Sequence, residues 1–366
     1  MRKDAPYISA LKKMKRLLWR RPEPHYKLTV KTANRGTRVL IVGVGAMGYK
    51  NALMLHELGY DVCGVCDLNI ASMERVRQIN EAVCFFPTVE AADPAQFDVV
   101  VVATRAGPRV ELVTRLVEVG FRRILCEKPI VNTMAGVAAF RQLAGQSDLK
   151  ICVHHLRRWS PDYQSIKMCI REGALGTVRS VTCYVKANGF GNIGSHYIDL
   201  ILYLLEQPIE RVHAWFDPKN QAGREIAHHD PCGVAMYRLG SGATFLLDVQ
   251  HEGLYRGAQT LIQVECEYGA ITVWERHGVW YEEDRRRGLR ECHPFELALN
   301  VPILKGNERA RLLDCIMTTL LHDQEDRSLL DACSAAEAIL AAQRAGALGE
   351  AIALPLNVDV PTVGRF

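Results

Sequence analysis

A glycine-rich turn between an apolar strand and a helix constrains this sequence more than any other feature. The segment Gly43-Val44-Gly45-Ala46-Met47-Gly48 has the G-x-G-x-x-G spacing and follows the strand predicted over 38–42. Helical periodicity begins inside this segment, and Asp67 ends the next predicted strand. Strand, glycine turn, helix, strand and acid in this order indicate a βαβ unit that binds a dinucleotide. The alternative is a glycine-rich turn in a βαβ unit that binds none.

Each residue of the turn has its own expected role. Gly43 allows the tight turn, Gly45 lets a pyrophosphate approach the backbone, and Gly48 lets the helix pack on the strand. At Ala46 and Met47 the helix N-terminus presents unpaired N–H groups to phosphate oxygens. We predict that these five residues form the cofactor site.

The acid at the end of the second strand selects between cofactors. Asp67 is expected to accept hydrogen bonds from the ribose hydroxyls and to repel a 2′-phosphate. The next residues, Leu68-Asn69-Ile70, include no Arg or Lys that would hold such a phosphate. The sequence therefore favours NAD over NADP.

Strands and helices alternate up to about residue 152. The apolar strands and the helical segments between them are predicted over 46–58, 61–66, 98–103, 110–119 and 123–126. This alternation predicts a parallel sheet that helices cover on both faces. We therefore expect an α/β, dinucleotide-binding Rossmann domain over 37–152.

The pattern of predicted secondary structure changes after Arg157. Five β-rich segments with glycine-containing turns lie over 177–187, 232–239, 243–251, 259–267 and 270–275. No helical pattern separates the last four, which predicts antiparallel hairpins. Helical patterns return over 307–322 and 330–346. We expect an α+β domain over 153–355, followed by a C-terminal tail over 356–366.

The net charge of +4 comes from the N-terminal arm, residues 1–36. Residues 1–38 contain twelve Lys or Arg and two acids, whereas the rest of the chain has 33 bases and 39 acids. A mildly acidic body argues against a nucleic-acid-binding domain. The basic amphipathic segment 7–21 is expected to rest weakly on an anionic membrane surface, to pack on a neighbouring subunit, or to stay solvated.

Apolar runs in this chain are short. None approaches the roughly 18–20 residues that span a bilayer, and the basic N-terminus lacks the apolar core of a secretory signal. We expect a cytoplasmic protein with reduced cysteines. No metal site is predicted, because His228-His229-Asp230 lacks further ligands at suitable spacing.

A lysine follows the strand predicted over 123–126, in the triplet Glu127-Lys128-Pro129. Open α/β sheets bind their ligands at the carboxyl ends of the strands. Lys128 is therefore a candidate functional residue, with an ordinary surface lysine as the alternative.

The helix predicted over 193–205 is apolar almost all round and should be buried. Its polar residues share one narrow stripe, which consists of Asn192, Ser195, His196, Asp199 and Tyr203. A buried polar group without a partner costs about 1–3 kcal/mol, so the stripe must face partners or a wet cleft. His196 either transfers protons or is satisfied by Asp199 in a polar core.

Together these motifs resemble the family of glucose-fructose oxidoreductase, inositol dehydrogenase and MocA (Gfo/Idh/MocA). The resemblance runs from about 38 to 355 and rests on GVGAMG, Asp67, Glu127-Lys128-Pro129, residues 154–161 and Gly194–Asp199. It implies a Rossmann domain followed by an open-faced, mostly antiparallel sheet that often mediates homo-oligomerisation. It also implies hydride transfer between a nicotinamide cofactor and a sugar, cyclitol or related carbonyl.

The resemblance assigns catalysis to Lys128 and His196. Both suit the chemistry, because oxidising a secondary alcohol requires a base that takes the hydroxyl proton. Many members carry an aspartate where this chain has Asn192. We expect Asn192 to position the reacting hydroxyl. The resemblance also implies that an asparagine at this position points to nucleotide sugars as the substrate class. Asp199 is also assigned to substrate binding.

Two adjacent arginines and a tryptophan follow the predicted Rossmann domain and belong to the predicted substrate site. Arg157, Arg158 and Trp159 suit a phosphate or carboxylate together with a sugar face, with an interdomain salt-bridge cluster as the alternative.

After the strand over 98–103, members of the family usually read Thr-Pro and later have a histidine. This chain has Thr104-Arg105 and then Arg109. We predict that Thr104, Arg105, Glu127 and Lys128 line the cofactor site and that Arg105 reaches a substrate anion.

The sequence thus predicts an NAD-dependent oxidoreductase that acts on a sugar, cyclitol or nucleotide sugar and forms a homo-oligomer. One alternative is a biliverdin-reductase-like reductase of a non-sugar carbonyl or imine. A second is a non-catalytic, NAD-sensing regulatory protein on the same scaffold, against which the presence of both Lys128 and His196 argues.

Overall fold

The computed structural model describes residues 36–186, 189–221, 230–250, 260–274, 278–283, 307–322 and 324–356. Their contacts divide into two units. The described residues up to Leu156, together with those of Gly306–Glu337, form the Rossmann unit, and those of Arg157–Lys305 and Ala338–Phe366 form the sheet unit. The domain boundary at residue 152 stays a prediction. The basic segment 7–21, His228, His229 and the tail beyond Leu356 lie outside the described residues.

Six parallel strands form the sheet of the Rossmann unit, in the order β3-β2-β1-β4-β5-β6. They are β1 (Arg38–Val42), β2 (Asp61–Cys66), β3 (Cys84–Phe86), β4 (Val99–Val102), β5 (Arg123–Cys126) and β6 (Lys150–Val153). The chain winds outward from β1 to β3 and then from β4 to β6. The carboxyl ends of β1 and β4 therefore flank the switch point where open sheets bind ligands.

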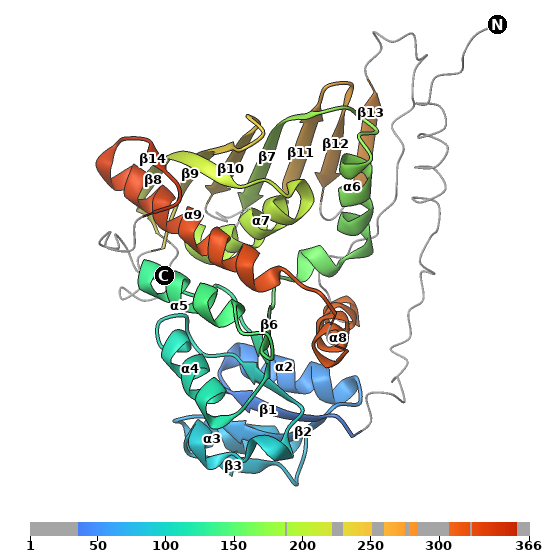
Figure 1. Ribbon diagram of the computed structural model, residues 1–366, viewed down its shortest axis with the longest axis vertical. Helices are drawn as coiled ribbons and strands as arrows, with labels where there is room; N and C mark the ends of the chain where they lie inside the picture. Colours follow the sequence, from blue (N-terminus) through green and yellow to red (C-terminus); the bar gives the residue numbers. More distant parts are fainter. Residues whose placement is uncertain are drawn as a thin grey trace, which may run out of the picture. The chain divides into compact units, whose positions relative to one another are not determined.

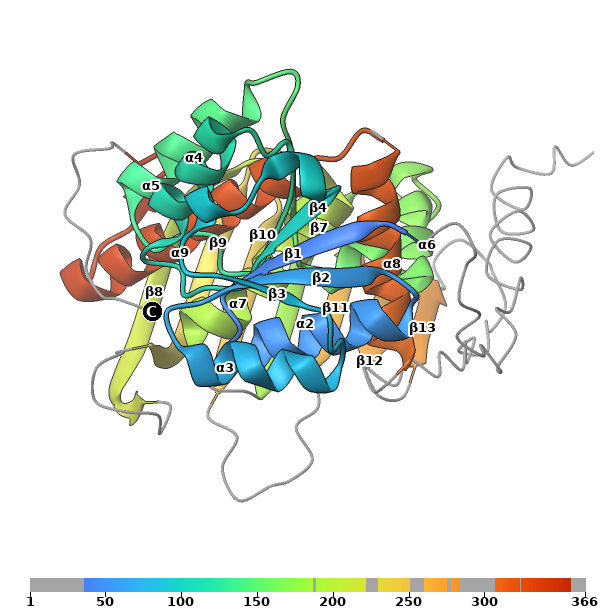
Figure 2. The ribbon, with the colours of Figure 1, turned by 90° about the horizontal axis from the view of Figure 1, so that it is seen from below.

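Helices cover both faces of this sheet, as the apolar strands predicted. They are α2 (Ala46–Glu57), α3 (Ile70–Glu74), α4 (Arg109–Val119), α5 (Met134–Ala144) and α8 (Asn307–Leu321). Figure 2 shows α4 and α5 on one face and α2 and α3 on the other. Each valine of β4 is buried, because a central parallel strand has no face toward water.

Helix α8 comes from far along the chain, yet it packs on α2, β5 and β6. The hydroxyl of Tyr60 donates a 2.9 Å hydrogen bond to the carboxylate of Asp314 in this helix. Both side chains are buried, so each satisfies a polar group that would otherwise be costly. The sequence predicted this helix but assigned it to the second domain.

The sheet unit holds eight strands, in the order β13-β12-β11-β7-β10-β9-β8-β14. They are β7 (Val178–Lys186), β8 (Ile209–Gln221), β9 (Pro231–Leu239), β10 (Thr244–Gln250), β11 (Leu261–Cys266), β12 (Gly269–Trp274), β13 (Gly278–Glu283) and β14 (Ile352–Ala353). The α/β plus α+β fold class is confirmed. One expectation is wrong: β10 and β11 form no hairpin, because β7 lies between them and pairs with β10 in parallel.

Helices cover one face of this second sheet. Helix α7 (Phe190–Leu205) contacts β9 and β10, and α6 (Pro161–Arg171) packs on α7. Figure 1 shows helix α9 (Ser328–Leu348) along the same face of the sheet. From Ala338 onward α9 belongs to the sheet unit, and the Ala338 carbonyl accepts a hydrogen bond from the Tyr237 hydroxyl. Side chains on the strands alternate in burial, so the opposite face stays partly open.

Within the described residues, no helix is both long and apolar enough to cross a membrane.

Candidate functional site

The glycine turn after β1 has the geometry that its predicted roles require. Gly43 has a φ of +84°, and a Cβ there would lie 2.8 Å from the Thr104 side chain. A Cβ on Gly48 would overlap the carbonyl oxygen of Gly43, so the helix approaches the turn as closely as its backbone allows. A Cβ on Gly45, by contrast, would meet no atom within 4 Å. The backbone at Gly45 is therefore open to a ligand.

The polar groups at this turn fit NAD. Asp67 accepts backbone N–H bonds from Val44 (2.6 Å) and Asn69 (2.8 Å), one on each carboxylate oxygen. A carboxylate has about four lone-pair positions, so two remain for ribose hydroxyls. Ala46 and Met47 are exposed at the N-terminus of α2, where N–H groups attract phosphate oxygens.

Glu127 lies at the centre of a buried polar network that the sequence did not predict. The Nδ2 of Asn51 in α2 donates to its Oε1 at 2.9 Å, and Nδ1 of His154 lies 2.7 Å from the same oxygen. All three side chains are buried. The network joins the helix of the glycine turn to the ends of β5 and β6, next to Lys128. In the sequence, only the polar character of these three residues in otherwise apolar segments could have indicated the network.

The network keeps Glu127 ionised. Burial disfavours the charged carboxylate, but the charge of His154, hydrogen bonds from His154 and Asn51, and the charge of Lys128 together lower the pKa of Glu127 to about 2. The unfolded chain restores an ordinary pKa near 4.5. Ionised Glu127 therefore stabilises the native state above pH 4.5, and this stabilisation is lost as the pH falls toward 2.

We expect Glu127→Gln to remove this pH dependence. The unfolding free energy of the parent chain should fall by about 3 kcal/mol more than that of the variant between pH 4.5 and 2. Urea titrations at several pH values measure the difference. Glu57→Gln, on the same unit, is the control and should follow the parent. Equal pH slopes for Glu127→Gln and the parent would contradict the assigned charge state.

Three more predicted cofactor residues belong to this unit. Lys128 is half-buried one residue beyond Glu127, and Arg105 is exposed beyond the end of β4. The hydroxyl of Thr104 is buried and has no hydrogen-bond partner among the described residues. A buried hydroxyl is costly unless a ligand completes its bonding, so Thr104 also fits a bound cofactor.

Helix α7 carries the predicted polar stripe, and the structure divides it by exposure. Asn192 is exposed and His196 is half-buried, whereas Ser195 and Asp199 are buried. The Ser195 hydroxyl donates to the Asn192 carbonyl at 2.9 Å, as polar side chains inside helices often do. Tyr203 is half-buried like His196, so Asn192, His196 and Tyr203 are the members of the stripe with exposed surface.

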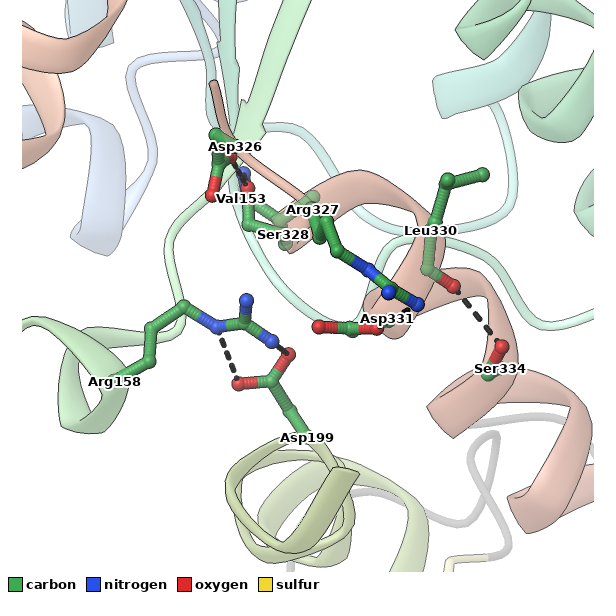
Figure 3. Close-up of polar contacts among 9 residues, drawn as sticks. All are labelled: Val153, Arg158, Asp199, Asp326, Arg327, Ser328, Leu330, Asp331 and Ser334. Atoms are coloured by element: carbon green, nitrogen blue, oxygen red, sulfur yellow. Dashed lines mark hydrogen bonds and ion pairs between the residues drawn. The ribbon is translucent and has the colours of Figure 1, made fainter. Parts of the chain in front are cut away.

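Arg158 and Asp199 form a buried ion pair within the sheet unit (Figure 3). The Nε and Nη2 atoms of Arg158 donate to the two carboxylate oxygens at 3.1 and 2.7 Å, and the exposed fractions are 4% and 0%. Both residues were expected to bind substrate, which stays a prediction. The observed ion pair agrees with the alternative of a salt-bridge cluster. Both residues belong to the sheet unit, however, so this pair is not an interdomain one.

The neighbours of Arg158 differ in what they offer to a ligand. The guanidinium of Arg157 lies 4.3 Å from the ring centroid of Tyr197 and donates to its hydroxyl at 2.7 Å. The indole N–H of Trp159 is buried and lacks a hydrogen-bond partner in the described part of the chain. Trp159 therefore remains the better candidate of the two for contact with a substrate.

Asp230 caps α7, and sequence reasoning considered it only as a metal ligand. Its carboxylate accepts N–H bonds from Gly191 (2.6 Å) and Asn192 (2.8 Å). Gly189, with φ +86°, precedes the helix where a Cβ would overlap this carboxylate. The cap joins residues almost forty positions apart, so no local pattern reveals it.

Asp230→Ala should lower the unfolding free energy by about 1–2 kcal/mol, because two N–H groups at the start of α7 lose their acceptor. Chemical denaturation followed by circular dichroism measures the loss. Glu210→Ala, an exposed acid on β8, should change stability by less than about 0.5 kcal/mol. An unchanged midpoint for Asp230→Ala would rule out the cap.

Residues 37–155 match the model of the Gfo/Idh/MocA family, described as an oxidoreductase family with an NAD-binding Rossmann fold. Inositol 2-dehydrogenase of Rhizobium meliloti (strain 1021) is 25% identical over 54% of this chain and 64% of its own length. D-apiose dehydrogenase of Paraburkholderia graminis is 25% identical over 59% and 61%. The match thus spans less than two thirds of these curated relatives.

Solved structures share the fold of both units. The WlbA dehydrogenase from Bordetella pertussis, in complex with NADH and UDP-GlcNAcA, has a TM-score of 0.74 at 21% identity, covering 88% of this chain and 99% of its own. The myo-inositol dehydrogenase from Lactobacillus casei, in complex with NAD(H) and myo-inositol, has a TM-score of 0.71 at 19% identity, with coverages of 89% and 98%. Residues 37–155 therefore form an NAD-binding Rossmann domain of the kind that the Gfo/Idh/MocA family of oxidoreductases carries.

Proposed function

We propose that this chain is an NAD-dependent oxidoreductase acting on the CH–OH group, or the matching carbonyl, of a sugar, cyclitol or nucleotide sugar. The observation that carries the proposal is the pairing of an open Gly45 with an Asp67 carboxylate that retains lone pairs for ribose hydroxyls. Thr104, Lys128 and the N-terminus of α2 complete the cofactor set, and Asp67 favours NAD over NADP.

The reaction divides into a hydride and a proton. Bound NAD, which Gly45, Asp67 and Thr104 would hold, would supply the acceptor for the hydride of the carbinol carbon. The hydroxyl proton passes to Nζ of Lys128 or to the imidazole of His196, and the same groups return a proton in the reverse direction.

Asn192, His196 and Trp159 support a polyhydroxylated substrate. An exposed amide, a half-buried imidazole and an indole N–H supply donors and acceptors for sugar hydroxyls. We assign Asn192 to the reacting hydroxyl. The Arg158–Asp199 pair is assigned to holding α7 in place, since its charges already face each other. The WlbA dehydrogenase, whose structure is a complex with UDP-GlcNAcA, favours nucleotide sugars among the candidates.

The test combines binding with turnover. Purified protein with NAD or NADH is screened by thermal shift against cyclitols, aldoses, uronic acids and nucleotide sugars, and each hit is assayed by nicotinamide absorbance. Turnover of one of these classes supports the proposal. Turnover only of a non-sugar carbonyl or imine favours the biliverdin-reductase-like alternative, and NAD binding without hydride transfer to any compound favours the sensor.

We further propose that the open face of the second sheet mediates homo-oligomerisation. Trp215 on β8, Met236 on β9 and Trp274 on β12 are exposed by 57%, 45% and 39%. Apolar side chains exposed along a sheet typically mark an interface. Cytoplasmic location and membrane contact through residues 7–21 stay predictions.

Trp215→Asp should shift the protein to a smaller species in light scattering, because a charge would be buried at the interface. Leu348→Asp, at an exposed position on α9, is the control and should leave the mass unchanged. A parent that is already monomeric, or a Trp215→Asp variant with the parent's mass, would contradict the interface.

A further inference from the structure

Arg109 is a buried cation held by backbone carbonyls. It is the first residue of α4 and only 1% exposed. One terminal nitrogen of its guanidinium donates to the carbonyl of Thr104. The other donates to the carbonyl of Pro129 and, at 3.4 Å, to that of Ile130. Within the described residues, the hydrogen bonds of this side chain therefore all go to carbonyl oxygens.

Such burial has an energetic cost that packing alone does not explain. Loss of water lowers the pKa of Arg109, and the charges of Cys126 and Glu127 offset this only in part. A guanidinium nonetheless stays protonated in proteins. An apolar side chain would fill the same space without that cost. The cation is useful here because its planar fork reaches two separate stretches of backbone at once.

The two stretches leave neighbouring strands of the sheet. Thr104 lies two residues beyond the end of β4, and Pro129 lies three residues beyond the end of β5. The strands are paired in parallel, so both loops start from the same edge. One loop carries Thr104 and Arg105, and the other carries Lys128. In a sheet of this order, the half that begins with β4 receives the second mononucleotide, and the half with the glycine turn receives adenosine.

We propose that Arg109 is a positioning residue that clamps the loops after β4 and β5 at the spacing required by the nicotinamide half of NAD. This inference rests on the proposed function, because it assumes that the Rossmann unit binds the cofactor in the family's orientation. Arg109 acts through the backbone of Thr104 and Pro129 rather than by touching the cofactor. The adenosine half, bound at Gly45 and Asp67, lies outside its reach.

The test compares two ligands on the full chain by calorimetric titration. NADH requires both halves of the site, whereas ADP-ribose lacks the nicotinamide ring. Arg109→Lys retains the charge but not the fork. We expect this variant to bind NADH about tenfold more weakly and ADP-ribose within about twofold of the parent. Arg115→Lys changes a half-exposed arginine of the same helix that pairs with Glu90, and this variant should bind both ligands like the parent.

Chemical rescue separates a clamp from general damage. Arg109→Ala leaves space for a small guanidinium, so methylguanidinium should restore NADH affinity at least tenfold, and methylammonium should not. Equal weakening of NADH and ADP-ribose in Arg109→Lys, or unchanged NADH affinity, would overturn the clamp. So would a failure of methylguanidinium to rescue Arg109→Ala. A parent that binds neither ligand would instead overturn the proposed function.

Discussion

Lys128→Ala is expected to lower turnover by about 10²–10⁴-fold, while NADH binding changes by no more than a few-fold. General acid–base catalysis contributes a factor of this size, and alanine can neither accept nor return the proton. The Lys128 side chain is only half-buried, so its truncation should leave the core intact. The neighbouring Glu127, which is buried, is unchanged in this variant. Steady-state kinetics with a substrate from the screen, together with calorimetric titration of NADH, measure both quantities.

A second substitution separates charge from proton transfer. Lys128→Arg retains the positive charge, but an arginine does not give up its proton at neutral pH. We expect it to be as inactive as Lys128→Ala if the lysine moves a proton. Recovery of most activity in Lys128→Arg would show that only the charge matters. Lys50→Ala, an exposed lysine on α2, is the control. Full turnover of Lys128→Ala would transfer the role to His196.

Gly45→Ala is expected to lower NADH affinity, whereas Gly48→Ala is expected to lower stability. A Cβ on Gly45 meets no protein atom within 4 Å, so the variant should fold with a stability within about 0.5 kcal/mol of the parent. The methyl group would lie where a pyrophosphate approaches the backbone, and NADH affinity should fall by about two orders of magnitude.

Gly48→Ala should instead destabilise the Rossmann unit, because its Cβ would overlap the carbonyl oxygen of Gly43. Backbone cannot move aside as a flexible side chain can, so we expect a loss of at least about 3 kcal/mol. Thermal and urea unfolding of the two variants, next to NADH titration, distinguish the cases. A stable Gly48→Ala that binds NADH, or a Gly45→Ala with full affinity, would contradict these assigned roles.

Local patterns predicted the central elements of the Rossmann unit, but not β3, β6, α3 and α5. The strands predicted over 61–66 and 123–126 coincide with β2 and β5, and the helix predicted over 46–58 is α2 to within one residue. The two strands are short and parallel and lie between helices, so their apolar runs determine them. In the sheet unit, β8, β13 and β14 were not predicted, and the partner of β10 was wrong. Pairing between distant strands depends on contacts that no local window contains.

The candidate site shows the same division. The glycine turn and Asp67 were predicted from their spacing, Lys128 from its place after a strand, and His196 from the polar stripe of its helix, and their roles stay predictions. What surrounds them depends on long-range contacts. Asn51 and His154 meet at Glu127 from α2 and the end of β6, and Asp230 caps α7 from the position just before β9.

The sequence by itself determined the class of fold and the family match of the Rossmann domain, since both follow from motifs that each consist of residues close together in the chain. Only the tertiary structure decided which charges face each other. Arg158 is turned to Asp199, and Arg109 is turned to the carbonyls of two loops. Both arginines look alike in a sequence. Burial removes water as a partner, and each guanidinium then binds whichever acceptors the fold brings to it.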